Sequence, residues 1–562
     1  MKTLLSIKAI TTSLLLGGVG IFSACSDEFL NRTPQDAPGA DNFLTDETSA
    51  KQLVIAAYNP WLEQMDMYGK RFVTACDALT DDSGIRNNDE AATWTFLPTS
   101  GYPRQWWQYA YQSVTAANYA IEQIPHLKEL GLTDAQIDPY IAEARFMRGF
   151  DYLFLTTFYG DVPLITKPLT SFAEYSQPRV AVADVFVQII SDFTFAKDHL
   201  SATNDKSGTP TQATAAAYLA KALLYKKDYP AAETAAREAI ALAEAAGYAL
   251  VDDYESIFTL ANEGNPELLF YFEFEANKSI SGGQDGNVWI VERMMRNLPT
   301  PLRHILGVAD GWGYAMPTRD LYDEYEADDP RRGATLYAPG DVYGIYREGA
   351  PYTHKYNTYV GNVLTPDSVT YQVGDTVKYD LAFTSPTTGL SCKKLTDNLA
   401  VLSNPRLSGV DVPLLRMADL YLFLAEALAE QNKSEALDWV NKVRARTSVN
   451  LPARTVSDGK KGDASLRDIV RHERRVELAT EGHRAFDLLR WDALKEVFGN
   501  GGEEKVKLHF YSDVKGGSAD GEDGRFKRAI GLSRFPTNHI LLPIPQYEMD
   551  NNTAITSNNP GY

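Results

Sequence analysis

The chain has 562 residues and a formal net charge of −20, with 44% hydrophobic and 11% aromatic residues. This composition is typical of a globular protein with a large core and excludes an intrinsically disordered chain. The acidic balance and the lack of a polybasic run argue against a nucleic-acid partner. Beyond the N-terminal region only Cys76 and Cys392 remain, so a disulfide framework does not hold the fold together. Whether these two cysteines pair stays open at this point.

The N-terminus has the organisation of a lipoprotein signal peptide. Two lysines precede an apolar run that ends at Phe22 and is too short for a comfortable membrane span. Small residues then precede Cys25 as in a bacterial lipobox, although Phe22 stands where Leu, Val or Ile is usual. We predict a signal peptide over residues 1–24 and lipid attachment at Cys25, with an ordinary secretory signal as the alternative. No other stretch is apolar enough to cross a bilayer, so we expect an anchored chain.

Helical periodicity dominates the first part of the mature chain. Apolar spacing predicts helices from Thr48, from Trp106, over Ile137–Tyr159 and over Ala183–Leu200. Apolar positions nearly encircle Ile137–Tyr159, so this helix is expected to be central and buried. Residues 77–103 show no helical period and are expected to form a loop region.

Residues 211–246 have the pattern of a tetratricopeptide unit of about 34 residues. Alanine stripes at helical spacing lie on both sides of a turn, and Pro230 suits the first turn of the second helix. Small facing residues let two antiparallel helices approach closely. Leu414–Arg446 suggests a second unit, and further helices must complete the stack because two units are too few for a solenoid.

Residues 248–411, between the two units, change character. Leu268–Phe274 has strand composition, and Tyr371–Phe383 alternates weakly, as a hairpin does. An irregular insert of this kind often holds a binding surface. We therefore expect a mainly α-helical fold with a loop-rich, partly β insert. Near the end of the chain, Gly499–Gly524 is expected to be an exposed loop.

The segment Arg471–Trp491 combines acids, arginines and two histidines. It begins as a helix whose apolar stripe continues into Glu473 and Glu477. A catalytic or metal site is one interpretation, but the zincin spacing is absent because residue 476 is Val. Buried carboxylates on the core-facing side of a helix need cationic partners, and the same segment contains Arg471, Arg474, Arg475 and Arg484. We therefore favour a buried ionic clamp between helices, and we expect the first helix of this segment to end at Gly482.

Several stretches resemble the SusD/RagB family of nutrient-binding outer-membrane lipoproteins. In chain order they are AEARFMRGFDYLFLTTFYGDVPLIT, PLLRMADLYLFLAEALAE, ERRVELATEGHRAFDLLRW and LPIPQYEMDNNTAITSNNPGY. The resemblance implies one domain over residues 25–562, with tetratricopeptide-like helix pairs within about 48–247 and 413–491 supporting a variable loop face. The acids after Cys25 also resemble the surface-export signal of Bacteroidetes lipoproteins.

The resemblance further implies a function. Family members capture oligosaccharides at the cell surface and pass them, uncut, to a TonB-dependent outer-membrane transporter. Some members serve peptide uptake instead, so a peptide-binding lipoprotein of the same architecture is the first alternative. A lipid-anchored glycosidase is the third hypothesis. The chain has no Gly-x-Ser-x-Gly elbow, phosphate-binding loop or Cys-x-x-Cys pair, so no catalytic residue, metal or cofactor is predicted.

Two loop regions carry the mixture of aromatic and polar side chains that binds sugars, in which rings stack on apolar sugar faces and charged or amide groups bind hydroxyls. Within them we predict these glycan-binding residues: Asp81, Asp82, Arg86, Asn88 and Trp94 in the first region, and Trp289, Trp312 and Tyr314 in the second. Trp94 and Trp312 roughly match, in position, loops that carry stacking aromatics in starch-binding relatives. Trp106 and Trp107 lie at helical spacing and are interpreted as core. A further aromatic cluster is formed by Tyr352, His354, Tyr356 and Tyr359.

Overall fold

The computed structural model describes residues 43–62, 76–84, 90–204, 208–275, 315–338, 341–344, 352–360, 363–372, 376–378, 390–396, 408–456, 465–498 and 540–562. The predicted signal peptide, Cys25 and the expected loop over Gly499–Gly524 lie outside these residues. Cys76 and Cys392 are both buried and both free, which answers the question of their pairing.

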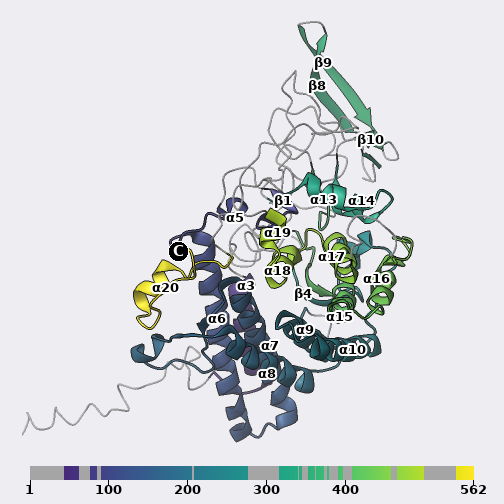
Figure 1. The fold of residues 1–562 in the computed structure, drawn as a ribbon. Coiled ribbons are helices and arrows are strands. Elements are labelled where there is room, and N and C mark those ends of the chain that lie inside the picture. Colours follow the sequence, from purple (N-terminus) through teal and green to yellow (C-terminus); the bar gives the residue numbers. More distant parts are fainter. Residues whose placement is uncertain are drawn as a thin grey trace, which may run out of the picture.

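Four long helices form one side of the molecule (Figure 1) and pack in chain order: α3 (Glu47–Leu62), α6 (Gly101–Gln123), α7 (Asp134–Tyr159) and α8 (Val182–His199). The second half of α7 is buried on almost every side, as its encircling apolar positions predict. Its buried Arg148 forms a fork with Asp192 of α8, at 2.9 and 2.7 Å from the two carboxylate oxygens. A paired charge can therefore lie inside this otherwise apolar layer.

The helices α9 (Gln212–Tyr225) and α10 (Tyr229–Ala245) form the predicted tetratricopeptide-like pair. The alanines of both stripes are buried against each other and against neighbouring helices. At the turn, the Asp228 carboxylate accepts a hydrogen bond from the Ala231 amide, and Pro230 occupies the first turn of α10. The helix pair and its start signal thus follow from local sequence.

A second pair is formed by α15 (Met417–Glu430) and α16 (Ala436–Arg444), and α15 packs on α10. The predicted unit began at Leu414, but that residue lies in strand β12 (Val412–Arg416), which pairs antiparallel with β4 (Leu268–Phe272). Every residue of both strands is buried. A fully buried apolar run cannot be told from a buried helix by its period, which is why this boundary is wrong in the sequence-based prediction.

The stack is completed by α17 (Leu466–Glu477), which packs on α15 and α16, and by α18 (His483–Arg490). The prediction that the first helix ends at Gly482 is wrong by more than a turn. The Glu477 carbonyl instead accepts hydrogen bonds from Tyr254 Oη at 2.7 Å and Lys394 Nζ at 3.0 Å. Gly482, with φ at 82°, is the residue that precedes α18.

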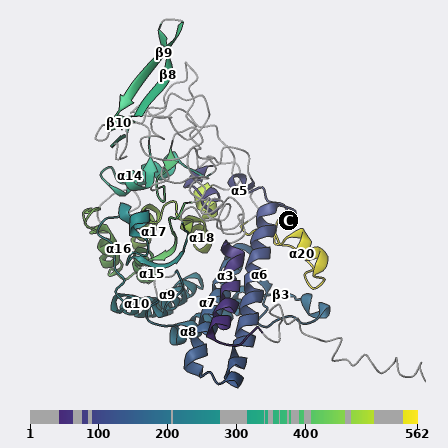
Figure 2. The same ribbon diagram turned by 180° about the vertical axis from the view of Figure 1, so that it is seen from behind.

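The insert contains strands and short helices on the side of the helical body from which a long hairpin projects (Figures 1 and 2). That hairpin is β8 (Tyr352–Val360) with β9 (Val363–Tyr371). Of the hairpin predicted over Tyr371–Phe383, Tyr371 ends β9 and Thr376–Lys378 pairs with Val342–Gly344, whereas residues 373–375 and 379–383 lie outside the described residues. The predicted strand at Leu268 is confirmed as β4. The remaining pairs are β1 (Ser83–Gly84) with β5 (Met316–Pro317), β2 (Val162–Pro163) with β3 (Arg179–Val180), β6 (Leu336–Tyr337) with β11 (Ser391–Cys392), and β7 (Val342–Gly344) with β10 (Thr376–Lys378).

The C-terminal segment folds back on the first helices, and α20 (Gln546–Asn551) lies beside α6 in Figure 1. At the end of α7, the Leu542 amide donates to the Phe158 carbonyl, and the Asn559 side-chain amide donates to the Tyr159 carbonyl. The other short helices are α5 (Glu90–Thr93), α13 (Arg319–Glu324), α14 (Arg331–Thr335), α19 (Leu494–Phe498), η1 (Ile124–Leu130), η2 (Phe172–Tyr175), η3 (Glu255–Phe258) and η4 (Leu260–Asn262).

Candidate functional site

Three of the predicted ligand residues lie within the described part of the chain, and all three are buried. Trp94, Asp81 and Asp82 are each 2% exposed. The Trp94 indole N–H donates to the Leu79 carbonyl at 3.1 Å, and its ring meets Phe96 edge-on. In this placement Trp94 offers no ring face to a sugar, because its side chain is buried. The expected ligand contact of these three side chains therefore has no support in the described geometry.

The two aspartates are held by arginines from the charged segment. Arg484 forks onto both carboxylate oxygens of Asp81, at 2.9 and 2.8 Å. Burial alone would raise the pKa of Asp81, but Arg475 and Arg484 hold it well below its usual range. Burial raises the pKa of Asp82 to about 7, and the neighbouring charge of Asp81 adds to this effect. Asp81 and Asp82 therefore pair with arginines inside the protein and hold the segment before β1 against α17 and α18.

The other predicted ligand residues, namely Arg86, Asn88, Trp289, Trp312 and Tyr314, lie outside the described residues. The described residues nearest to two of them, Arg86 and Tyr314, belong to a strand pairing that we call the attachment point. Strands β1 and β5 pair antiparallel, with Gly84 opposite Met316. Arg86 follows Gly84 by two positions in the sequence, and Tyr314 precedes Met316 by two.

The attachment point is reinforced by Thr318, directly after β5. Its amide donates to the Asp82 carbonyl at 2.9 Å, and its hydroxyl donates to the Asp81 carbonyl at 2.6 Å. The described residues Gly84 and Met316, which adjoin the two regions singled out in the sequence, are thus neighbours although they lie more than 200 positions apart. Sequence alone gave no signal for this pairing, because both strands are only two residues long.

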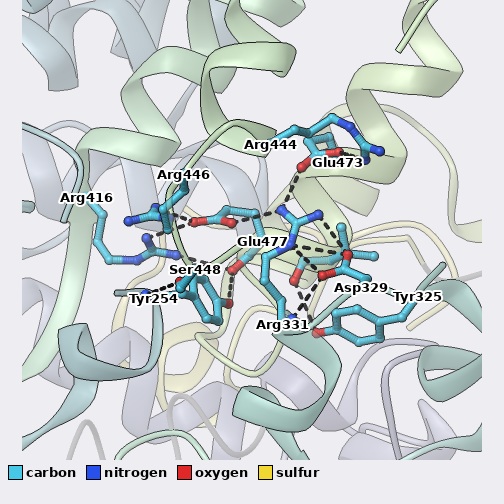
Figure 3. A network of polar contacts seen from close by, with 12 residues as sticks. Tyr254, Tyr325, Asp329, Arg331, Arg416, Arg444, Arg446, Ser448, Glu473 and Glu477 are labelled. Carbon is cyan, nitrogen blue, oxygen red and sulfur yellow. Dashed lines mark hydrogen bonds and ion pairs between the residues drawn. The ribbon is translucent and has the colours of Figure 1, made fainter. Parts of the chain in front are cut away.

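Beneath the attachment point lies the ionic clamp, which we define as Glu473, Glu477 and Glu481 with Arg331, Lys394, Arg416, Arg444 and Arg446. Figure 3 shows Glu473 and Glu477 among the four arginines. Glu477 accepts from Arg331, Arg416 and Arg446 at 3.0 to 3.2 Å. Burial would raise the pKa of both Glu477 and Glu481, but the surrounding arginines and Lys394 lower each to about 2. The buried ionic interpretation of Arg471–Trp491 is confirmed by these contacts.

The clamp offers no chemistry for catalysis. Each of its three carboxylates is buried and paired with buried cations, and the lowered pKa values of Glu477 and Glu481 make these two poor general acids. His472 contacts Glu324 at 2.7 Å, and His483 lies 3.8 Å from Asp419. Among the residues that the structure describes, no group of histidine, cysteine and acidic side chains is arranged to hold a metal ion.

A small pocket of about 50 Å³ lies next to the clamp, between α7, α9, β12 and α18. Its lining includes Phe154, Tyr218, Lys221, Phe486 and His483. The Lys221 ammonium lies 5.3 to 5.9 Å from the centres of three aromatic rings, and burial lowers its pKa to about 8. A cavity of this size has room for a few water molecules and none for a sugar ring.

Further described features bear on the predicted surfaces. Trp106 and Trp107 are buried on α6 and pack against rings of α7, which confirms their interpretation as core. The aromatic cluster from Tyr352 to Tyr359 lies on strand β8 rather than on a loop. Within the described part of the chain, every helix is too short or too polar to span a bilayer.

Comparison with known proteins identifies the family that this chain resembles. The model of the SusD family matches residues 267–562, and the model described as "Starch-binding associating with outer membrane" matches residues 28–224. The SusD-like protein P2 of Formosa agariphila is 28% identical over 507 residues, which cover 86% of this chain and 85% of that protein.

Solved structures share the fold. A SusD-like carbohydrate-binding protein of Bacteroides fragilis superposes with a TM-score of 0.70 at 22% identity, covering 91% of this chain and 99% of that one. A laminarin-binding SusD-like protein superposes with a TM-score of 0.66 at 23% identity, covering 92% and 100% of the two chains. The mainly helical, tetratricopeptide-like fold class is thereby confirmed.

Together the two family models cover most of the chain. SusD family proteins bind ligands without catalysis, so the matches give the glycosidase hypothesis no support. With the family match spanning more than half of its length, the chain belongs to the SusD family.

Proposed function

We propose that this protein is a cell-surface glycan-binding lipoprotein that captures oligosaccharides and delivers them to a TonB-dependent outer-membrane transporter. The observation that supports the proposal is the pairing of β1 with β5, because the predicted ligand residues Arg86 and Tyr314 each lie two positions in the sequence from this ladder. Sites held by rigid elements and formed by neighbouring loops are a common way to build a binding face.

Glycan is favoured as the ligand class for two reasons. Structurally similar proteins include a carbohydrate-binding protein and a laminarin-binding protein. The predicted residues Trp289, Trp312 and Tyr314 supply stacking rings, while Arg86 and Asn88 supply groups that bind hydroxyl pairs. Affinity is expected to be modest, because an open aromatic surface leaves much of a bound ligand in water.

Anchoring and the transporter partner belong to the same proposal. The predicted lipid at Cys25 would hold the chain at the outer membrane, and one matching family model describes association with that membrane. Cross-linking in intact outer membranes should recover a TonB-dependent transporter together with this protein. Recovery of the protein without any transporter would refute the partner.

The ligand class is tested by isothermal titration against a panel of oligosaccharides and peptides. We expect binding to at least one oligosaccharide and to no peptide. Exclusive binding to peptides would replace the glycan proposal by the peptide alternative. Release of shorter products during incubation with the panel would contradict a purely binding role.

The site is tested by Trp312→Ala, with Trp94→Ala as the control. Trp312→Ala should weaken glycan binding by about tenfold or more, since one stacked ring contributes on the order of 1–3 kcal/mol. Trp94→Ala should instead lower thermal stability, because its ring is buried and its N–H is bonded to Leu79. Unchanged affinity in Trp312→Ala would remove this residue from the site.

A further inference from the structure

Two lysines within the described residues are buried, and their ammonium groups have very different surroundings. Lys394 Nζ donates to the carbonyls of Glu477 and Ala479 at 3.0 and 2.9 Å and to the Glu481 carboxylate at 2.7 Å. Lys221 is 8% exposed, yet it forms no hydrogen bond and no ion pair with any residue that the structure describes. Because a buried lysine is almost always paired, the position of Lys221 needs an explanation.

Lys221 lies on α9, and its side chain lines the small pocket of about 50 Å³. Its Nζ lies 5.3, 5.9 and 5.7 Å from the ring centres of Tyr218, Phe423 and Phe486. Aromatic faces attract a cation, but they do not replace the three hydrogen bonds that an ammonium makes in water. Burial lowers the pKa of Lys221 to about 8, so at pH 7 the group is still mostly charged and offers donors to the pocket.

The charged groups around Lys221 are paired with one another. Asp419 Oδ1 accepts from Arg474 at 2.8 Å, and Asp487 accepts from Arg474 and Arg490. Glu481, which also lines the pocket, accepts from Lys394 and Arg416. Each of these acids contacts a cation, and none of them forms an ion pair with Lys221. The described chain therefore gives the Lys221 charge no anionic partner in contact.

His483 is a second donor at the same pocket. Its ring forms no hydrogen bond with the described residues, and its Nδ1 lies 3.8 Å from Asp419 Oδ2. Burial lowers the pKa of His483, so the ring is neutral at pH 7 and carries one N–H. The other side chains of the lining are mostly apolar, among them Phe150 and Leu153. Water could accept from both donors, but only an anion also compensates the buried charge.

We propose that this pocket is a binding site for a small monovalent anion, namely chloride or a carboxylate of one or two carbons, which contacts the Lys221 ammonium. A volume of about 50 Å³ admits an ion of this size and excludes a sugar ring. The apolar wall removes the ion from bulk water, which strengthens its attraction to the ammonium. The proposed site goes beyond glycan binding and does not depend on it.

Melting temperatures test the site in a zwitterionic buffer at pH 7 to which sodium chloride, formate or acetate is added. Without these salts Lys221→Met should melt above the parent, since it lacks the unpaired charge. At least one of the three salts should raise the parental melting temperature in a saturable way, and Lys221→Met should lack this rise. Benzoate carries the carboxylate of formate on a ring too large for the pocket, so it should give no saturable rise.

The matched control is Lys442→Met. Lys442 Nζ also lies near aromatic rings, at 4.2 and 5.2 Å from the centres of Tyr421 and Trp439. It is half-exposed, however, and it pairs with Glu244 at 3.0 Å. Lys442→Met removes the same charge from the chain, so general effects of salt should change alike in both variants. This control should keep the parental, saturable rise in melting temperature.

The pH dependence and a heavy halide give independent readouts. Because the ammonium of Lys221 loses its proton above pH 8, the rise should be much smaller at pH 9.5 than at pH 7. A crystal soaked in sodium bromide should show an anomalous peak within hydrogen-bond distance of Lys221 Nζ. A response to chloride and bromide alone would identify a halide site, and a response to formate or acetate would identify a carboxylate site.

Three results would overturn the proposal. The first is a parental melting temperature that shows no saturable response to chloride, formate or acetate. The second is an equal response in Lys221→Met, which would place the anion elsewhere. The third is a bromide-soaked crystal with only water beside Lys221 Nζ and no response to the two carboxylates.

Discussion

Replacing Glu477 by Gln tests the ionic clamp directly. The Glu477 carboxylate accepts from Arg331 through one oxygen and from Arg416 and Arg446 through the other. Glutamine keeps the volume of the side chain, but it removes the charge and turns an amide donor towards a guanidinium donor. The three arginines stay buried with one carboxylate fewer, so the folded state is expected to lose free energy.

The size of the loss follows from the pKa of the carboxyl. Burial would raise it, but the arginines lower it from 4.5 to about 2. A shift of this size corresponds to about 3 kcal/mol, which agrees with the 3–5 kcal/mol typical of breaking a buried ion pair. Because the pKa is lower in the folded state, this stabilisation is fully present above pH 4.5 and is lost as the pH falls towards 2.

Chemical denaturation at pH 7 and at pH 3.5 measures both effects. Glu477→Gln should lower the free energy of unfolding by about 3 kcal/mol at pH 7 and by about 2 kcal/mol at pH 3.5. The control is Glu435→Gln, whose half-exposed carboxylate lies 2.7 Å from Arg237 and whose loss should lower stability by less than about 1 kcal/mol. A loss in Glu477→Gln no larger than in this control would refute the reasoning, as would a loss that grows towards acid.

Two further predictions concern the buried lysine and the anchor. Lys221→Met should raise the melting temperature at pH 7, because it replaces an ammonium in a mostly apolar cavity by a side chain of similar length. The pKa of Lys221 is lowered to about 8 in the folded state, so the gain in stability should shrink between pH 8 and pH 10.5. A variant that is less stable than the parent at pH 7 would contradict this prediction. Cys25→Ala should leave the protein unlipidated and move it out of the outer-membrane fraction, as measured by fractionation and intact mass, and a variant that stays membrane-bound like the parent would exclude lipidation at Cys25.

Local sequence determined much of the scaffold. The apolar positions around α7, the alanine stripes of α9 and α10 and the start signal at Pro230 act within a few residues of each other. Such periodicities are imposed by the helix itself and need no knowledge of distant contacts. The clamp followed from the same logic, because carboxylates on a core-facing stripe require partners.

Only the tertiary structure decided which partners those are and where the helix ends. The Glu477 carboxylate accepts hydrogen bonds from arginines of α14, β12 and the turn after α16. Its backbone carbonyl accepts hydrogen bonds from Tyr254 and Lys394 instead of from a further helical amide. No local pattern encodes contacts between residues so far apart in the chain.

The candidate site shows the same distinction between what the sequence predicts and what the tertiary structure decides. Sequence identified two regions rich in aromatic and polar residues, and composition suffices for that. It did not show that Trp94, Asp81 and Asp82 turn inward, nor that Gly84 and Met316 are neighbours. Both facts depend on pairing between segments more than 200 residues apart, with Arg475 between them, because the free energy of a buried charge is set by whichever carboxylates the fold brings to it.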